Sequence, residues 1–128
     1  MDRKAVTALE FALVAPVVLV LIFGSLELGL IWWTKNALQM TAAITARCVA
    51  LGSCADPGSF AVNYASNWAL SRLISVSNVT YTTNGACYGS SKVYAMVTID
   101  CEFWADSLLP PPIPNLSFSV SACYPMAS

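Results

Sequence analysis

A long uncharged run near the N-terminus constrains this chain more than any other feature. Sixteen residues from Phe11 to Leu26 carry no charge, and after Glu27 the apolar sequence continues to Trp33. As an α-helix, residues 11–33 span about 33 Å, which is enough to cross the hydrocarbon core of a bilayer. The sequence therefore predicts a transmembrane helix.

The residues that flank this run predict its orientation. Arg3 and Lys4 precede it, so the positive-inside rule places the N-terminus in the cytoplasm and the rest of the chain outside. Trp32 and Trp33 lie where an aromatic belt would meet the far interface. A cleaved secretory signal begins in a similar way, but no small-x-small cleavage site follows the run closely. We therefore favour a retained membrane segment.

Composition excludes several classes of protein. Only 10% of the 128 residues are charged, whereas about 25% is usual in a soluble domain. The net charge of −1 provides no basic surface for nucleic acid. The chain has no histidine, which removes the commonest general base and the commonest zinc ligand. We expect one membrane-anchored domain with no catalytic activity, metal site, cofactor or nucleic-acid partner.

The helix is expected to continue beyond the membrane. Residues 34–51 are rich in Ala, Leu, Met and Gln, which favour helix, and Gly52 with Ser53 is the first stop signal. The sequence thus predicts one helix over residues 6–51. Its second half carries a narrow apolar stripe made of Leu38, Ala42, Thr45 and Val49.

Residues 52–128 are expected to form a small globular head, which makes the fold class α+β. Pro57 starts a predicted helix over 57–75, and Asn84-Gly85 is a turn signal. Three antiparallel strands are predicted at 76–83, 93–103 and 116–123. One face of the middle strand is apolar, with Val93, Ala95, Val97, Ile99, Cys101 and Phe103. The exposed half of the long helix is expected to cover this face.

Five cysteines in a head outside the cytoplasm indicate disulfides. If the second and third strands are antiparallel neighbours, Cys87 comes close to Cys123. Cys48 and Cys54 are near in sequence and would join the end of the long helix to the following loop. Cys101 then remains as a buried free thiol on the apolar face.

The N-terminal sequence RKAVTALEFALVAPVVLVLIFGSLELG resembles bacterial pilins, most closely the TadE-like pilins of tight-adherence (Tad, type IVc) systems. The resemblance implies that a prepilin peptidase removes residues 1–5 as a leader by cutting between Ala5 and Val6. Glu10 then becomes the fifth residue, followed by Phe11. The family usually has Gly where this chain has Ala5. The resemblance further implies insertion in the inner membrane, pilus assembly machinery as a partner, and co-assembly with itself or other pilins.

Two acidic residues in the apolar helix are candidates for assembly contacts. A carboxylate in this environment is costly unless it is paired. Glu10 could stay in the headgroup region, or it could meet a neighbour's positive group: the freed amino group of Val6 after cleavage, or Arg3 or Lys4 without it. Glu27 could similarly be a docking charge, or it could reach the far interface.

Pro16 interrupts the hydrogen bonding of this helix. It has no N–H for the carbonyl of Ala12, at a cost of about 3 kcal/mol in a helix interior. We expect the helix to open between Leu13 and Val17 in an assembled filament, whereas an ordinary proline kink is the alternative.

Three function classes follow. The first is a structural pilin subunit that polymerises into an extracellular pilus for surface attachment. The second is a monomeric single-pass envelope protein with a periplasmic binding head. The third is a membrane-tethered enzyme. Asp100 and Glu102 share one face of the predicted middle strand and could act as a catalytic carboxylate pair, but acids at such positions more commonly belong to a solvated sheet face.

Overall fold

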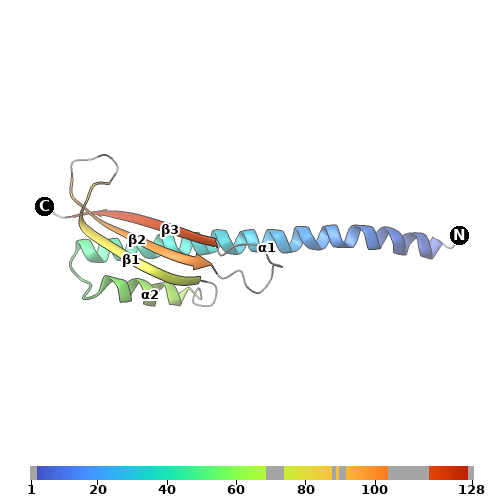
Figure 1. Cartoon of the computed structure of the whole chain (residues 1–128), viewed down its shortest axis with the longest axis horizontal. Coiled ribbons are helices and arrows are strands. Elements are labelled where there is room, and N and C mark those ends of the chain that lie inside the picture. Colours follow the sequence, from blue (N-terminus) through green and yellow to red (C-terminus); the bar gives the residue numbers. More distant parts are fainter. Residues whose placement is uncertain (1–2, 69–73, 88, 90–91, 104–115, 127–128) are drawn as a thin grey trace. The chain divides into compact units, whose positions relative to one another are not determined.

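The computed structural model describes residues 3–68, 74–87, 89, 92–103 and 116–126. Two helices and three strands make up these residues, and the α+β class expected from the sequence is confirmed (Figure 1). In chain order they are α1 (Arg3–Ala50), α2 (Pro57–Asn67), β1 (Ile74–Gly85), β2 (Tyr94–Phe103) and β3 (Leu116–Pro125).

The chain divides into two compact units, Met1–Trp33 and Thr34–Ser128. The first unit contains the apolar half of α1, and none of the side chains described in it is buried. The second unit contains the remainder of α1 together with α2 and the sheet. A core is thus found only in the second unit among the described residues, and we refer to this unit as the head.

The head is built on an antiparallel sheet with the strand order β1-β2-β3. The central strand alternates as its sequence predicts, because one of its faces is buried and is formed by Ala95, Val97, Ile99 and Cys101. The predicted face also included Val93 and Phe103. Val93 lies just before β2 and is half exposed, and the side chain of Phe103 is not among those described. Val120 of β3 is also buried.

The second half of α1 supplies the other side of this core. Most residues of its buried stripe are small; the stripe is Thr34, Ala37, Leu38, Thr41, Ala42, Thr45 and Ala46. The amide Nε2 of Gln39 donates a hydrogen bond of 2.8 Å to the carbonyl of Ser121 in β3. The predicted cover of the sheet by the long helix is therefore present. Its stripe begins earlier than expected, at Thr34, and the predicted stripe residue Val49 is only half-buried.

Threonines are accommodated in this stripe because their hydroxyls bond back to the helix. Thr41 Oγ1 donates to the carbonyl of Ala37 at 2.9 Å, and Thr45 Oγ1 donates to the carbonyl of Thr41 at 2.8 Å. A buried hydroxyl without a partner would cost free energy, and these bonds supply that partner.

Helix α1 ends in a Schellman motif at the stop signal found in the sequence. Gly52 adopts φ 62°, its N–H bonds to the carbonyl of Val49 (3.1 Å), and the N–H of Ser53 bonds to the carbonyl of Cys48 (3.1 Å). Glycine favours this left-handed backbone because it has no Cβ. The turn brings Cys48 to Cys54, and the two form a disulfide.

The boundaries of the second helix and first strand differ from those expected. Helix α2 ends at Asn67 instead of continuing to residue 75, and Ile74 is the first residue of β1, paired with Phe103. Residues 69–73 lie outside the described residues. Ile74 and Ser75 pair with Phe103 and Glu102 of β2, so tertiary pairing overrides the helical pattern at these two residues.

The turn expected at Asn84-Gly85 is also absent, because β1 continues to Gly85, which pairs with Tyr94. A Cβ at this glycine would lie only 2.9 Å from Met96 Cβ. The glycine therefore allows a close approach of the two strands at an irregularity in their register.

The second disulfide joins Cys87 to Cys123, as the antiparallel order of β2 and β3 predicts. It closes a loop of 36 residues, worth about 3–4 kcal/mol in the loop-entropy account. Cys101 is free and buried, and its thiol donates to the carbonyl of Phe118 at 3.3 Å.

Candidate assembly surface

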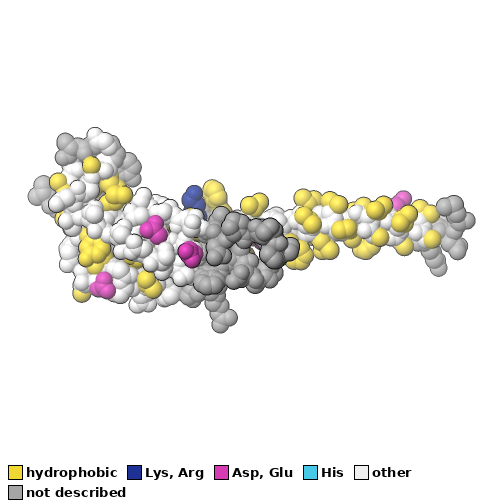
Figure 2. Space-filling model, viewed as in Figure 1, with side chains coloured by type: hydrophobic (Ala, Val, Ile, Leu, Met, Phe, Trp, Pro, Cys, Tyr) yellow, Lys and Arg dark blue, Asp and Glu magenta, His cyan; other side chains and the backbone are white. Residues whose placement is uncertain are grey.

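The N-terminal half of α1 presents large apolar side chains to its surroundings. Figure 2 shows hydrophobic side chains gathered along this half of the helix. Phe11 is 73% exposed at one end of the segment, and Trp32 is 71% exposed at the other. None of the most apolar window of the helix is buried, and its length and composition fit a single-pass membrane anchor. An exposed apolar surface of this extent marks a membrane or protein contact.

The residues expected at the processing and docking site all lie in the first turns of α1. One regular helix contains Ala5, Val6, Glu10 and Phe11, and each of these side chains is exposed. Within the part of the chain that the structure describes, Glu10 forms no ion pair. The structure thus leaves its carboxylate accessible to a group from another molecule.

Helix α1 runs without a break through Pro16, whose side chain is exposed. The single chain therefore accommodates the missing hydrogen bond to Ala12 within a continuous helix. The opening between Leu13 and Val17 was expected for the assembled state, and it stays a prediction.

Glycines provide room for a neighbouring helix on the same segment. A Cβ built at Gly24 or at Gly29 would meet nothing within 4 Å. Small residues on membrane helices let a second backbone come close. Glu27 lies between these glycines, and its side chain is half-buried, as are Gly24 and Ile31 of the same segment.

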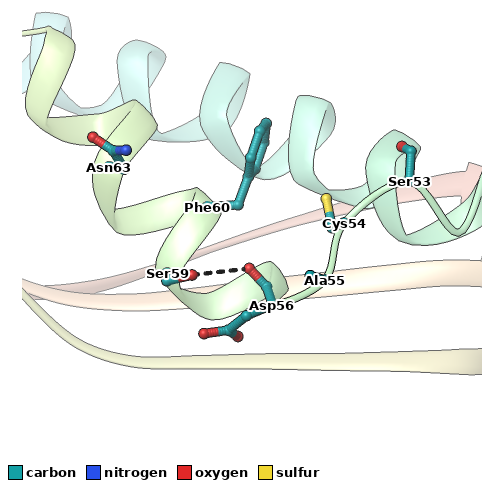
Figure 3. A pocket seen from close by; sticks show the side chains of 7 residues that line it. All are labelled: Ser53, Cys54, Ala55, Asp56, Ser59, Phe60 and Asn63. Carbon is teal, nitrogen blue, oxygen red and sulfur yellow. Dashed lines mark hydrogen bonds between the residues drawn. The ribbon is translucent and has the colours of Figure 1, made fainter.

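A shallow hollow lies beside the start of α2 in the head, shown in Figure 3. Its lining residues are Ser53, Cys54, Ala55, Asp56, Ser59, Phe60 and Asn63. The carboxylate of Asp56 caps α2 by accepting a bond from the N–H of Gly58 at 3.1 Å, and Ser59 Oγ donates to the Asp56 carbonyl at 3.2 Å. Phe60 points toward α1 (Figure 3) and stacks with Tyr64 at 6.1 Å between ring centroids. These polar groups are occupied in forming the helix start.

Among the described residues, the carboxylates elsewhere in the head do not form a cluster. Asp100 is half-buried and Glu102 is exposed on neighbouring outward positions of β2. Across the described ranges no three acidic or cysteine side chains come together as a metal site would require. The residues that sequence reasoning brought together as a possible carboxylate pair are therefore placed on the outward sheet face.

Sequence reasoning missed several residues that fix α1 against the sheet. Thr34 and Thr41 are fully buried, and Gln39 bonds to β3, although all three are polar. The signal was the recurrence of Ala and Thr at spacings of three and four from residue 34 to residue 46, because small residues at helical spacing allow close packing.

A comparison with protein families bears on the same helix. Residues 5–47 match the family of TadE-like proteins. The N-terminal segment of this chain is TadE-like. The match confirms the resemblance found in the N-terminal sequence. It includes the exposed apolar segment, both acidic residues of the helix and the whole buried stripe. No curated protein and no solved structure matches the chain.

Proposed function

We propose that this protein is a structural pilin subunit that polymerises into an extracellular Tad-type pilus used for surface attachment. The observation that carries the proposal is the pairing of an exposed, apolar, TadE-like helix segment with a separately packed, disulfide-bonded head. A subunit of this design can be stored in a membrane and later packed against copies of itself. In this role the chain has no catalytic activity.

Before assembly, the apolar half of α1 spans the inner membrane. Arg3 and Lys4 hold the N-terminus on the cytoplasmic side, and the head lies outside, where its two disulfides can form. A prepilin peptidase then cuts between Ala5 and Val6, and the assembly machinery extracts the subunit. The TadE-like segment supports this sequence of events by its family.

In the filament, the apolar segments of many subunits form the core. Leaving lipid for a bundle of helices exchanges one apolar environment for another, so the hydrophobic effect alone does not fix the arrangement. Side-chain packing and paired charges must do so. In this account the exposed carboxylate of Glu10 meets a positive group at the N-terminus of a neighbour.

Replacing Glu10 by Ala tests this proposal. We expect Glu10→Ala to leave the amount of protein in the inner membrane unchanged, because the apolar helix is intact. Filaments recovered by shearing should be lost, because the docking charge is missing. The matched control is Glu102→Ala, which removes an exposed carboxylate from the head and should leave filaments intact.

Normal filaments from Glu10→Ala would contradict the docking role. If the unaltered chain stays in the membrane fraction under conditions in which the cell makes pili, the proposal of a pilus subunit fails. A monomeric envelope protein with a binding head is then the better account.

A further inference from the structure

The outward face of the sheet carries an ordered set of polar side chains. Directly paired residues of antiparallel strands point their side chains to the same side, so an outward residue of β2 has one such neighbour in β1 and one in β3. Thr98 pairs with Thr80 and Ser121, and the next two outward positions of β2 are paired in the same way. The resulting set, which we call the oxygen array, consists of Ser75, Asn78, Thr80, Thr98, Asp100, Glu102, Ser117, Ser119 and Ser121.

Each side chain of the oxygen array is accessible from outside the head. Those of Thr98 and Asp100 are half-buried, and all the others are exposed. Strands lie about 4.8 Å apart and alternate residues of one strand about 6.8 Å apart, so the array measures about 10 Å by 14 Å between its outermost Cα positions. The array is therefore an extended surface and not a pocket.

The array has hydrogen-bonding capacity that the protein itself does not use. In the described part of the chain, none of its side chains forms a hydrogen bond or an ion pair. Hydroxyls of the helices differ, because those of Ser25, Thr41 and Ser66 donate to backbone carbonyls of their own helix. The side-chain oxygens of the array are thus all available to a ligand.

The chemistry of the array limits what it can bind. Its hydroxyl and amide groups both donate and accept hydrogen bonds, whereas its two carboxylates only accept. The array contains no base, so the negative charges of a nucleic acid, an anionic lipid or an acidic polysaccharide would meet Asp100 and Glu102 without compensation. It also contains no large apolar side chain, which the centre of a protein–protein interface requires. The matching partner is rich in uncharged hydroxyl groups.

The short side chains of the array favour binding of this kind. Apart from the two acids they are Ser, Thr and Asn, and their backbone is held in place by the pairing of the three strands. Ordering long, flexible side chains at an interface opposes binding, and this cost is small for short ones. Weak hydrogen bonds made side by side along the sheet can therefore sum to a useful affinity.

We propose that the oxygen array binds a neutral polysaccharide, whose hydroxyls bond to the Ser, Thr and Asn side chains and to the carboxylates of Asp100 and Glu102. Hydrogen bonds to a carboxylate are stronger than those between neutral groups, so the two acids make the strongest contacts. This inference rests on the proposed pilus function and names the class of surface to which the pilus attaches. Many copies along one filament bind such a surface together, which raises the overall affinity above that of one array.

Pelleting of sheared filaments with insoluble polysaccharides tests this site. Unaltered filaments should bind at least one of the neutral probes cellulose, mannan and cross-linked dextran. They should not bind carboxymethyl cellulose, because its negative charges face the two acids of the array. The double variant Asn78→Ala, Ser119→Ala removes both neighbours of Asp100 within the array and should lower the affinity about tenfold or more.

The matched control is the double variant Asn36→Ala, Asn63→Ala. It removes two exposed amides from the helices of the head and should bind the neutral probe as the unaltered chain does. Non-reducing peptide maps of each variant report whether both disulfides of the head have formed.

The outcomes separate this inference from the proposed function. The polysaccharide site is wrong, while the pilus function stands, if filaments bind no neutral probe, bind carboxymethyl cellulose equally well, or bind unchanged after Asn78→Ala, Ser119→Ala. If the chain is absent from filaments, the pilus function fails. The detergent-solubilised full chain, held at high density on a sensor, then tests the array against soluble mannan and dextran: binding that the double variant weakens supports the site, and no binding overturns it.

Discussion

Leu38 is the largest fully buried side chain of the stripe with which α1 covers the sheet, at 0% exposure. Replacing it by Ala leaves a cavity in a small core whose neighbouring stripe residues are Ala and Thr. We expect Leu38→Ala to lower the free energy of unfolding by about 2–5 kcal/mol. Denaturant unfolding of the full chain in detergent, followed by near-ultraviolet circular dichroism, measures this change.

The matched control for this prediction is Met40→Ala on the opposite side of the same helix. Met40 is 54% exposed, so its truncation should change the free energy of unfolding by less than about 0.5 kcal/mol. Equal effects of the two substitutions would show that the head does not pack through the stripe of α1.

The thiol of Cys101 connects burial with pH. Burial, and secondarily the negative charge of Asp100, raises the pKa of this thiol from 9.0 to about 11. The folded state therefore keeps the proton over a pH range in which the unfolded state has lost it. The free energy of unfolding contributed by this group is constant below pH 9 and falls as the pH rises from 9 to 11.

Selective labelling of cysteine with carbon-13 tests this pKa directly. The Cβ resonance of Cys101 should titrate with a midpoint near pH 11 in the folded chain, and nearer pH 9 after unfolding in denaturant. A folded-state midpoint near 9 would mean that the thiol is accessible to water, contrary to its 1% exposure.

At the scale of elements, regular patterns were predictable from the sequence, and boundaries set by distant pairing were not. The alternation of β2 predicted its buried face, and the antiparallel order of β2 and β3 predicted the Cys87–Cys123 disulfide. The end of α2 was placed too late, because the pairing of Ile74 with Phe103 depends on residues far along the chain. Secondary-structure propensity alone does not predict that contact.

The same contrast between local patterns and contacts made only in the folded chain applies to the candidate assembly surface. The apolar segment and its two acids were identified from composition and position, because their chemistry is local to one helix. Thr45 was identified as part of the stripe, but the buried Thr34 and Thr41 were not. The polarity of Thr41 is compensated by a hydrogen bond to the preceding turn that only the folded helix provides. Whether a small polar residue on a helix is buried is therefore difficult to predict from the sequence.

A further prediction concerns the hydrogen bonding of helix α1 near Pro16. The helix is continuous in the single chain, and in the filament we expect its hydrogen bonding to open between Leu13 and Val17, where neighbouring subunits and water can satisfy the freed carbonyls. A filament structure at side-chain resolution measures this. Hydrogen bonding that stays continuous there, apart from the one bond that proline cannot make, would leave only a kink.

At the scale of the whole molecule, the two units suit two environments. The unit Met1–Trp33 has no buried side chain among its described residues and needs lipid or other helices around it, whereas Thr34–Ser128 has its own core and two disulfides. A chain of this kind is expected to be stable only when its apolar segment is covered. Assembly into a filament provides that cover outside the membrane.

The measurement that tests this account most directly is the intact mass of the protein in filaments sheared from cells and kept free of detergent. We predict that the chain is present and begins at Val6, and that reduction adds two hydrogens for each of its two disulfides. Recovery of the chain only from detergent-solubilised membranes, with none in the sheared filaments, would contradict the claim that it is a pilus subunit.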